Sequence, residues 1–311
     1  MNDVIDFSCG NLFDKVYKHL ALPDSTILGT RITKKVILEN NALTSSDKKL
    51  VNDIIQSIEW LNTLKPETLN ILTYVTEKVE YIELAVLKVS LKDTLENQEK
   101  LKHSLIKKVS KLFHSLIPYP VILLLELNKE VAISLADKRI NQSDSSKLVV
   151  EHYYNTQWFN IRTLRDNENE FLSNFSLKNV SSFNYYEMYQ DFISMLIALE
   201  ISYISGSYRN TIVPNSGRLW SHKSPIDKYE ASLFQSGSNE EKTQLLKELA
   251  SLESELSNIR NKLKKDLQMN EKMRLNIQAR EVKQEISRII SQLVSSIKIV
   301  ENIDFNEFYS G

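Results

Sequence analysis

Three charged residues in succession, Asp137, Lys138 and Arg139, form the sharpest basic cluster in the sequence. Lysine and arginine side chains contact the phosphate oxygens of nucleic acids, so Lys138 and Arg139 are candidate nucleic-acid-binding residues. Lys34 and Lys35 are candidates for the same role, because they lie on a predicted strand, residues 31–39, that could neighbour the cluster. The competing interpretation is a solvated turn in which Asp137 pairs with Arg139, since exposed ion pairs contribute little stability.

Two acids and a lysine raise the alternative of a magnesium-dependent nuclease. In such a site carboxylates bind Mg²⁺ while the lysine assists the attacking water. Glu80, Glu83 and Lys88 fall within one predicted strand, residues 78–91. Side chains alternate along a strand, so Glu83 and Lys88 point to opposite faces, which breaks the required spacing. An inward carboxylate paired with a core lysine or tyrosine is the competing interpretation.

The sequence lacks the motifs that other kinds of catalysis require. The only cysteine is Cys9, and the five histidines have no metal-ligand spacing. The sequence contains no Gly-x-Ser-x-Gly turn and no glycine-rich phosphate loop. We therefore expect no catalytic residues, no metal and no cofactor.

Length and composition indicate an ordinary globular protein. The 311 residues are 42% hydrophobic and 25% charged, and 39 basic residues balance 40 acidic ones to a net charge of -1. Any binding to nucleic acid must therefore come from a local patch. With no signal peptide and no apolar stretch long enough to span a bilayer, we expect a cytoplasmic protein without a membrane partner.

The elements that would position these residues indicate an α+β fold. The apolar run at residues 121–127 and the alternating run at 131–136 predict a central β-hairpin that turns at Asn128 and Lys129. Strands are also predicted at 68–75 and 78–91, and helices at 44–61, 97–117 and 185–204. We expect a mixed, mainly antiparallel sheet flanked by helices in a body of residues 1–236.

The pattern of residues 237–311 predicts an antiparallel coiled-coil helical hairpin, with one long bent helix as the alternative. Apolar residues recur at spacings of three and four from Leu245 to Leu263, and a second such seam begins at Val282. The two seams bury each other, so apolar residues outside them should be covered by the chain's own body, by a second copy or by another protein. The predicted partner-binding residues are Leu246, Met269, Met273 and Leu275.

Several segments together resemble a bacterial family known as domain of unknown function 4391 (DUF4391). The segments that carry the resemblance are residues 32–50, 58–71, 80–91, 117–144 and 268–286. The resemblance implies a non-catalytic accessory or adaptor subunit of an anti-phage, restriction-like defence system. Its expected partners are a helicase, a DNA methyltransferase or both, with DNA and a second copy of the chain as further candidates. A divergent magnesium-dependent nuclease of the same kind of system is the alternative.

Overall fold

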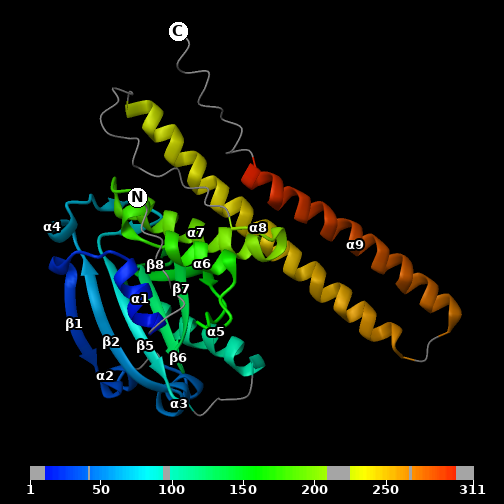
Figure 1. The fold of residues 1–311 in the computed structure, drawn as a ribbon, viewed down its shortest axis with the longest axis horizontal. Helices are drawn as coiled ribbons and strands as arrows, with labels where there is room; N and C mark the ends of the chain where they lie inside the picture. Colours follow the sequence, from blue (N-terminus) through cyan, green and yellow to red (C-terminus); the bar gives the residue numbers. More distant parts are fainter. Residues whose placement is uncertain (1–10, 41–42, 94–98, 209–224, 266–267, 299–311) are drawn as a thin grey trace, which may run out of the picture. The chain divides into compact units, whose positions relative to one another are not determined.

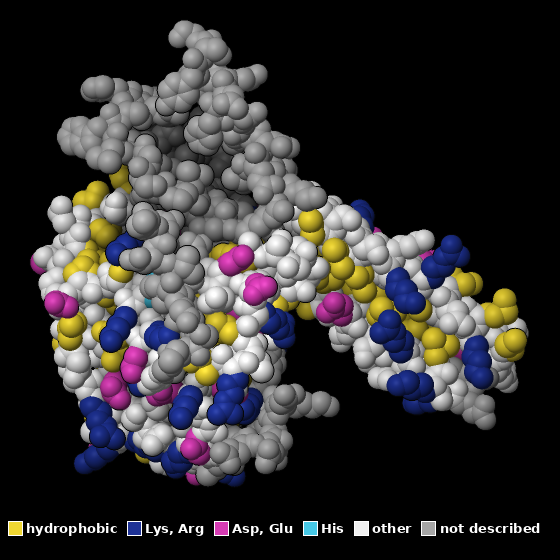
Figure 2. Space-filling view, in the orientation of Figure 1, with side chains coloured by type: hydrophobic (Ala, Val, Ile, Leu, Met, Phe, Trp, Pro, Cys, Tyr) yellow, Lys and Arg dark blue, Asp and Glu magenta, His cyan; other side chains and the backbone are white. Residues whose placement is uncertain are grey.

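The chain divides into two compact units. The computed structural model describes residues 11–40, 43–93, 99–208, 225–265 and 268–298. One unit comprises residues 1–199 and 212–221, and the other comprises residues 200–211 and 222–311. The first contains a β-sheet with its flanking helices, and the second contains the two long C-terminal helices (Figure 1). Basic and acidic side chains are interspersed over the visible face of the first unit (Figure 2).

A six-stranded mixed sheet forms the centre of the first unit, which confirms the predicted fold class. Its strand order is β1-β2-β5-β6-β7-β8, and only the β5–β6 pair is parallel. The strands are β1 (Ile27–Ile32), β2 (Ile55–Leu64), β5 (Leu84–Leu91), β6 (Val121–Leu127), β7 (Glu130–Asn141) and β8 (Asp144–Asn155). A small second sheet pairs β3 (Tyr74–Val75) with β4 (Glu80–Tyr81).

Helices flank this sheet in the first unit. They are α1 (Leu12–His19), α2 (Lys34–Leu38), α3 (Ser45–Asp53), α4 (Pro66–Leu69), α5 (Glu99–Leu116), α6 (Asp166–Asn174) and α7 (Tyr185–Ser205), of which residues 200–205 belong to the second unit. Short 3₁₀ turns occupy Asp24–Thr26 and Leu177–Asn179. Helix α5 makes the crossover that a parallel β5–β6 pair requires.

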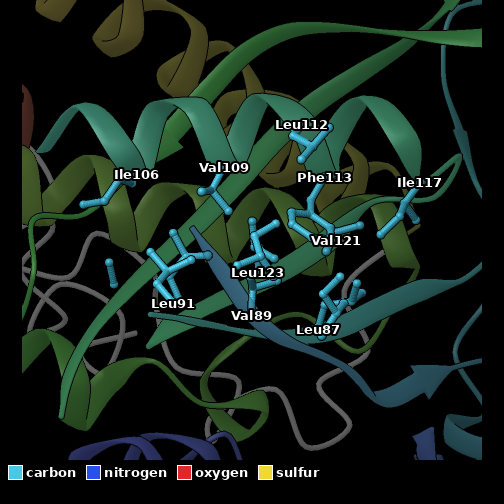
Figure 3. Close-up of a cluster of buried hydrophobic side chains, with 14 of the residues drawn as sticks. Leu87, Val89, Leu91, Ile106, Val109, Leu112, Phe113, Ile117, Val121 and Leu123 are labelled. Atoms are coloured by element: carbon cyan, nitrogen blue, oxygen red, sulfur yellow. The ribbon is translucent and has the colours of Figure 1, made fainter. Parts of the chain in front are cut away.

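The main core lies between α5 and one face of the sheet. Ile106, Val109 and Phe113 of α5 point toward the strands, where they meet alternate residues of β5 and β6 such as Val89 and Leu123 (Figure 3). Phe113, Val89 and Leu123 are fully buried. The spacing of three and four residues on the helix and of two residues on the strands places both apolar sets on facing surfaces.

The opposite face of the sheet is covered by α1 and α7. Lys88 alternates with the core residues of β5, and its Nζ lies 3.8 Å from the ring centroid of Phe13 on α1. Asp137 on β7 accepts a hydrogen bond from Gln190 on α7. The sheet is thus covered by helices on both faces, so the charged side chains of its central strands sit beneath them.

The β6–β7 hairpin is confirmed in detail. Leu127 pairs with Glu130, and the two residues between them, Asn128 and Lys129, have φ angles of 49° and 68°. Positive φ at both central positions gives the turn a twist that matches the flanking strands.

Four element predictions were wrong in whole or in part. The segment predicted as one strand at 78–91 is two strands, β4 and β5, which belong to different sheets. The segment predicted as a helix at 44–61 is a helix only through Asp53 and then the strand β2. The segment predicted as a strand at 31–39 contains the end of β1 and the short helix α2. The segment predicted as a strand at 68–75 contains the end of α4 and only two strand residues.

No helix in the described part of the chain is both long enough and apolar enough to cross a membrane.

Candidate functional site

Lys138 is buried, which overturns its predicted contact with nucleic acid. Strand β7 continues to Asn141, so the charged cluster lies within the strand and not at its end. Lys138 is 3% exposed, and its Nζ donates hydrogen bonds to the carbonyl oxygens of Ile117 and Tyr119, just beyond the end of α5. Carbonyls at a helix C-terminus attract a cationic group. Lys138 therefore caps the C-terminal end of α5, and its buried amino group cannot reach a phosphate.

Burial shifts the proton equilibria around Lys138. Burial lowers the pKa of Lys138 to about 7. Burial, and then the nearby Lys138, hold the pKa of His114 well below its usual range. The Nε2 of His114 lies 3.0 Å from the Oγ of Ser134. These groups form a buried polar cluster between α5 and β7, and we assign it a structural role.

The other predicted nucleic-acid residues do not gather into one site. Arg139 pairs with Glu151 on β8, and Asp137 instead accepts hydrogen bonds from Tyr154 and Gln190. Lys35 forms an exposed pair with Glu39, 3.9 Å apart. Burial, and then the nearby Lys92, lower the pKa of Lys34. Lys34 and Lys35 lie on α2 and not on the predicted strand.

The three predicted nuclease residues do not converge: burial, then Glu83 and then Glu80, raise the pKa of Tyr119, so both acids lie near that residue, whereas Lys88 has another partner. Glu83 lies between β4 and β5, with a carboxylate oxygen 3.7 Å from the Nζ of Lys65. Glu80 lies on β4. Lys88 instead pairs with Glu126 on β6, at 3.0 Å, and Glu126 also accepts a hydrogen bond from Ser90. Within the described ranges, no group of three or more histidine, cysteine, aspartate or glutamate residues could hold a metal ion.

In the second unit, α8 (Pro225–Leu263) and α9 (Met269–Lys298) pack against each other as a helical hairpin (Figure 1). The predicted body boundary at residue 236 falls inside α8. Near the turn, five buried residues of the two helices form an apolar cluster. These residues are Leu256, Ile259, Leu275, Ala279 and Val282. Most of the buried α8 and α9 positions follow the spacing of three and four predicted for the two seams.

Leu275 was wrongly predicted to face outward. It is 4% exposed and lies in the cluster between the two helices. Counting back from Val282 by three and then four residues passes through Ala279 to Leu275, so the second seam begins earlier than predicted. Leu246 is only partly exposed. Of the four predicted partner-binding residues, Met269 and Met273 are well exposed.

Met269, Met273 and Ile277 form an exposed apolar row on α9, which we call the tip stripe. Their exposed fractions are 74%, 60% and 59%. A spacing of four residues keeps them on one side of the helix over about 12 Å. Successive residues turn by about 100°, so the stripe lies on the side of α9 away from Leu275 and the seam. Helix α8 therefore cannot cover it.

Basic residues surround the tip stripe. Lys272 and Arg274 lie about 100° to either side of Met273, and Arg280 follows the stripe along the same side of the helix. From residue 260 to residue 280 the sequence has seven basic residues and two acidic ones, in a chain of net charge -1. Figure 2 shows Lys and Arg side chains beside hydrophobic ones along the hairpin. The tip is thus both apolar and positively charged.

Truncating a side chain to alanine should affect stability differently in the seam between the two helices and in the tip stripe. Leu275→Ala should lower the local stability of the hairpin by about 2–3 kcal/mol, because it removes a buried side chain from the seam. Met273→Ala should change stability by less than about 0.5 kcal/mol, because the side chain is exposed. Hydrogen exchange of α9 amides in the full chain measures both values. Equal losses for the two variants would show that the stripe is part of the hairpin's own packing.

Comparison with protein families gives one match. A family model described as "Domain of unknown function (DUF4391)" matches residues 20–286. No curated protein and no solved structure matches the chain.

Proposed function

This chain belongs to the DUF4391 family of unknown function, and from this premise we propose that it is a non-catalytic adaptor subunit that binds a partner protein through the tip of its helical hairpin. The partner is a helicase or a DNA methyltransferase of an anti-phage, restriction-like defence system. The chain acts in the cytoplasm.

The tip stripe is the observation that supports this proposal. Three large apolar side chains lie on the outer side of a helix whose other side is already filled by its hairpin partner. Scattered exposed apolar residues are ordinary, but a row rimmed by charged side chains is typical of a binding site. Methionine suits such a surface, because its flexible thioether adapts to the shape of a partner.

The first unit offers a second candidate contact, which an adaptor needs. Leu72 and Phe183 are 63% and 59% exposed. They lie next to each other, because Leu72 forms a parallel bridge with Asn184. Val75, on the adjoining strand β3, is 59% exposed. An adaptor that binds one molecule at each unit would connect two components of an assembly.

The nuclease alternative has less support, because its predicted lysine lies apart from its two predicted acids. It required Glu80, Glu83 and Lys88 to converge, whereas Glu83 faces Lys65 and Lys88 faces Glu126. Lys88 is also covered by the ring of Phe13. The pair of Lys88 and Glu126 joins two neighbouring strands beneath α1, where it stabilises the sheet.

Co-expression tests the proposal. The tagged full chain should co-purify with the helicase or methyltransferase encoded beside its gene, in a defined stoichiometry, as measured by size-exclusion chromatography with light scattering. A chain that remains a lone monomer in the presence of these proteins would contradict an adaptor function.

A further inference from the structure

We infer that the tip stripe binds an acidic amphipathic helix of the partner, which lies along α9 as a third helix. This inference rests on the proposed function, because it specifies the part of the partner protein that the hairpin recognises. It follows from the spacing, the length and the charge of the stripe.

The spacing of the stripe matches the surface of another helix. Met269, Met273 and Ile277 repeat every four residues, which is the row of side chains that packs into the grooves of a neighbouring helix. Their span of about 12 Å corresponds to two helical turns. Helices commonly recognise such surfaces through apolar side chains at these same intervals.

The charges around the stripe select an acidic partner. Lys272 and Arg274 flank it on both sides, and Arg280 follows it. A helix with apolar residues on one face and glutamate or aspartate beside them would place carboxylates next to all three basic groups. Complementary charges raise the association rate and disfavour the wrong partners.

The same charges argue against two other occupants. A second copy that pairs stripe to stripe would bring Lys272, Arg274 and Arg280 against the same residues, and like charges repel. An anionic lipid surface would attract the basic groups. However, Glu271 and Glu281 lie on the exposed surface beside them, and three apolar side chains give little area for insertion.

A synthetic peptide tests the inference on the full chain. The probe is a fluorescent helical peptide of about 21 residues, with leucine at heptad positions a and d and glutamate at the flanking positions. Its control has lysine in place of each glutamate. Fluorescence anisotropy should show binding of the acidic peptide that weakens as salt is raised, and at least tenfold weaker binding of the basic one.

Variants locate the binding site. Met273→Glu should weaken binding of the acidic peptide at least tenfold, whereas Gln292→Glu, the same added charge farther along the exposed surface of α9, should leave it unchanged. Lys272→Glu with Arg274→Glu should weaken binding and reduce its salt dependence. Circular dichroism checks that each variant remains helical.

Three results would overturn the inference. They are equal binding of both peptides, stronger binding of the chain to phosphatidylserine vesicles than to the acidic peptide, and self-association that Met273→Glu abolishes. The inference and the proposed function can fail separately. If the peptide binds but no neighbouring gene product co-purifies, the adaptor function fails and the helix site stands. If a partner co-purifies and Met273→Glu retains it, the helix site fails.

Discussion

Placing a carboxylate on the tip stripe should release the partner protein. The double variant Met273→Glu and Ile277→Glu puts two negative charges where apolar side chains would be buried in the complex. Burying an unpaired charge is strongly unfavourable. Central apolar contacts of an interface each contribute about 2 kcal/mol or more, so we expect the affinity for the co-purified partner to fall at least thirtyfold.

A structural check and a control variant distinguish a lost contact with the partner from an unfolded hairpin. Both substituted residues are more than half exposed, so the hairpin should keep its helicity and its hydrogen-exchange protection. Gln292→Glu is the matched control, and it should bind the partner with unchanged affinity. Unaltered binding by the double variant would remove the tip stripe as the recognition surface.

The buried Lys138 should make the stability of the first unit depend on pH. Its pKa is lowered to about 7 by burial, whereas an unfolded chain has a lysine pKa near 10.4. Between pH 7 and pH 9 the unfolded state therefore holds more protons than the folded state, so the free energy of unfolding rises with pH. Because of this one group, the free energy of unfolding should rise by about 2–3 kcal/mol from pH 7 to pH 9. The same increment should be lost as the pH falls back toward 7.

Replacement of this lysine isolates its contribution. Lys138→Met keeps a side chain of similar length but cannot titrate, so it should remove this rise with pH. It should also lower stability at pH 9, because the carbonyl oxygens of Ile117 and Tyr119 lose their donor. The chosen range lies above the pH at which His114 would titrate. Urea denaturation followed by the fluorescence of Trp60 and Trp158 measures the first unit.

The control for this experiment is Lys35→Met, the same substitution at an exposed pair. It should leave the pH dependence of the wild-type chain unchanged. Two results would show that Lys138 stays protonated in the folded protein. One is a wild-type free energy of unfolding that does not change from pH 7 to pH 9, and the other is a Lys138→Met variant whose free energy of unfolding rises as much as that of the wild type.

The sheet could be predicted where local pattern and tertiary environment agree. The apolar run of β6, the two turn residues and the alternation in β7 specify a hairpin within one short segment. The same holds for α5, whose apolar residues repeat at helical spacing and meet the core. These elements can be predicted from their local sequence, without knowledge of the residues that they contact elsewhere in the chain.

Strand β2 escaped prediction because two irregularities give it a helix-like pattern. Ile55 and Ile58 are three residues apart, which suggests one face of a helix. The register of β2 against β5 shifts between Ile55 and Ser57, and again between Trp60 and Asn62. A bulge adds a residue to one strand and so changes which side chains share a face. Both isoleucines therefore reach the same core without helical geometry.

The role of Lys138 also depends on distant residues. Its partners are carbonyl groups at the end of α5, and its neighbours in the sequence suggested only a charged strand end. On α9 the error had a local origin. The small side chain of Ala279 concealed the continuation of the seam, so Leu275 was assigned to the outer surface. Ile277 was missed, although it extends the four-residue spacing from Met269 and Met273.

Site-specific crosslinking tests the central claim most directly. A photo-reactive amino acid replaces Met273 in the full chain, which is co-expressed with the helicase or methyltransferase that we propose as its partner. Irradiation followed by mass spectrometry should give crosslinks from position 273 to an acidic helical segment of one of these proteins, and none from the same probe at position 292. Crosslinks at position 292 but not at 273, or none at either position while the proteins co-purify, would show that the hairpin tip does not hold the partner.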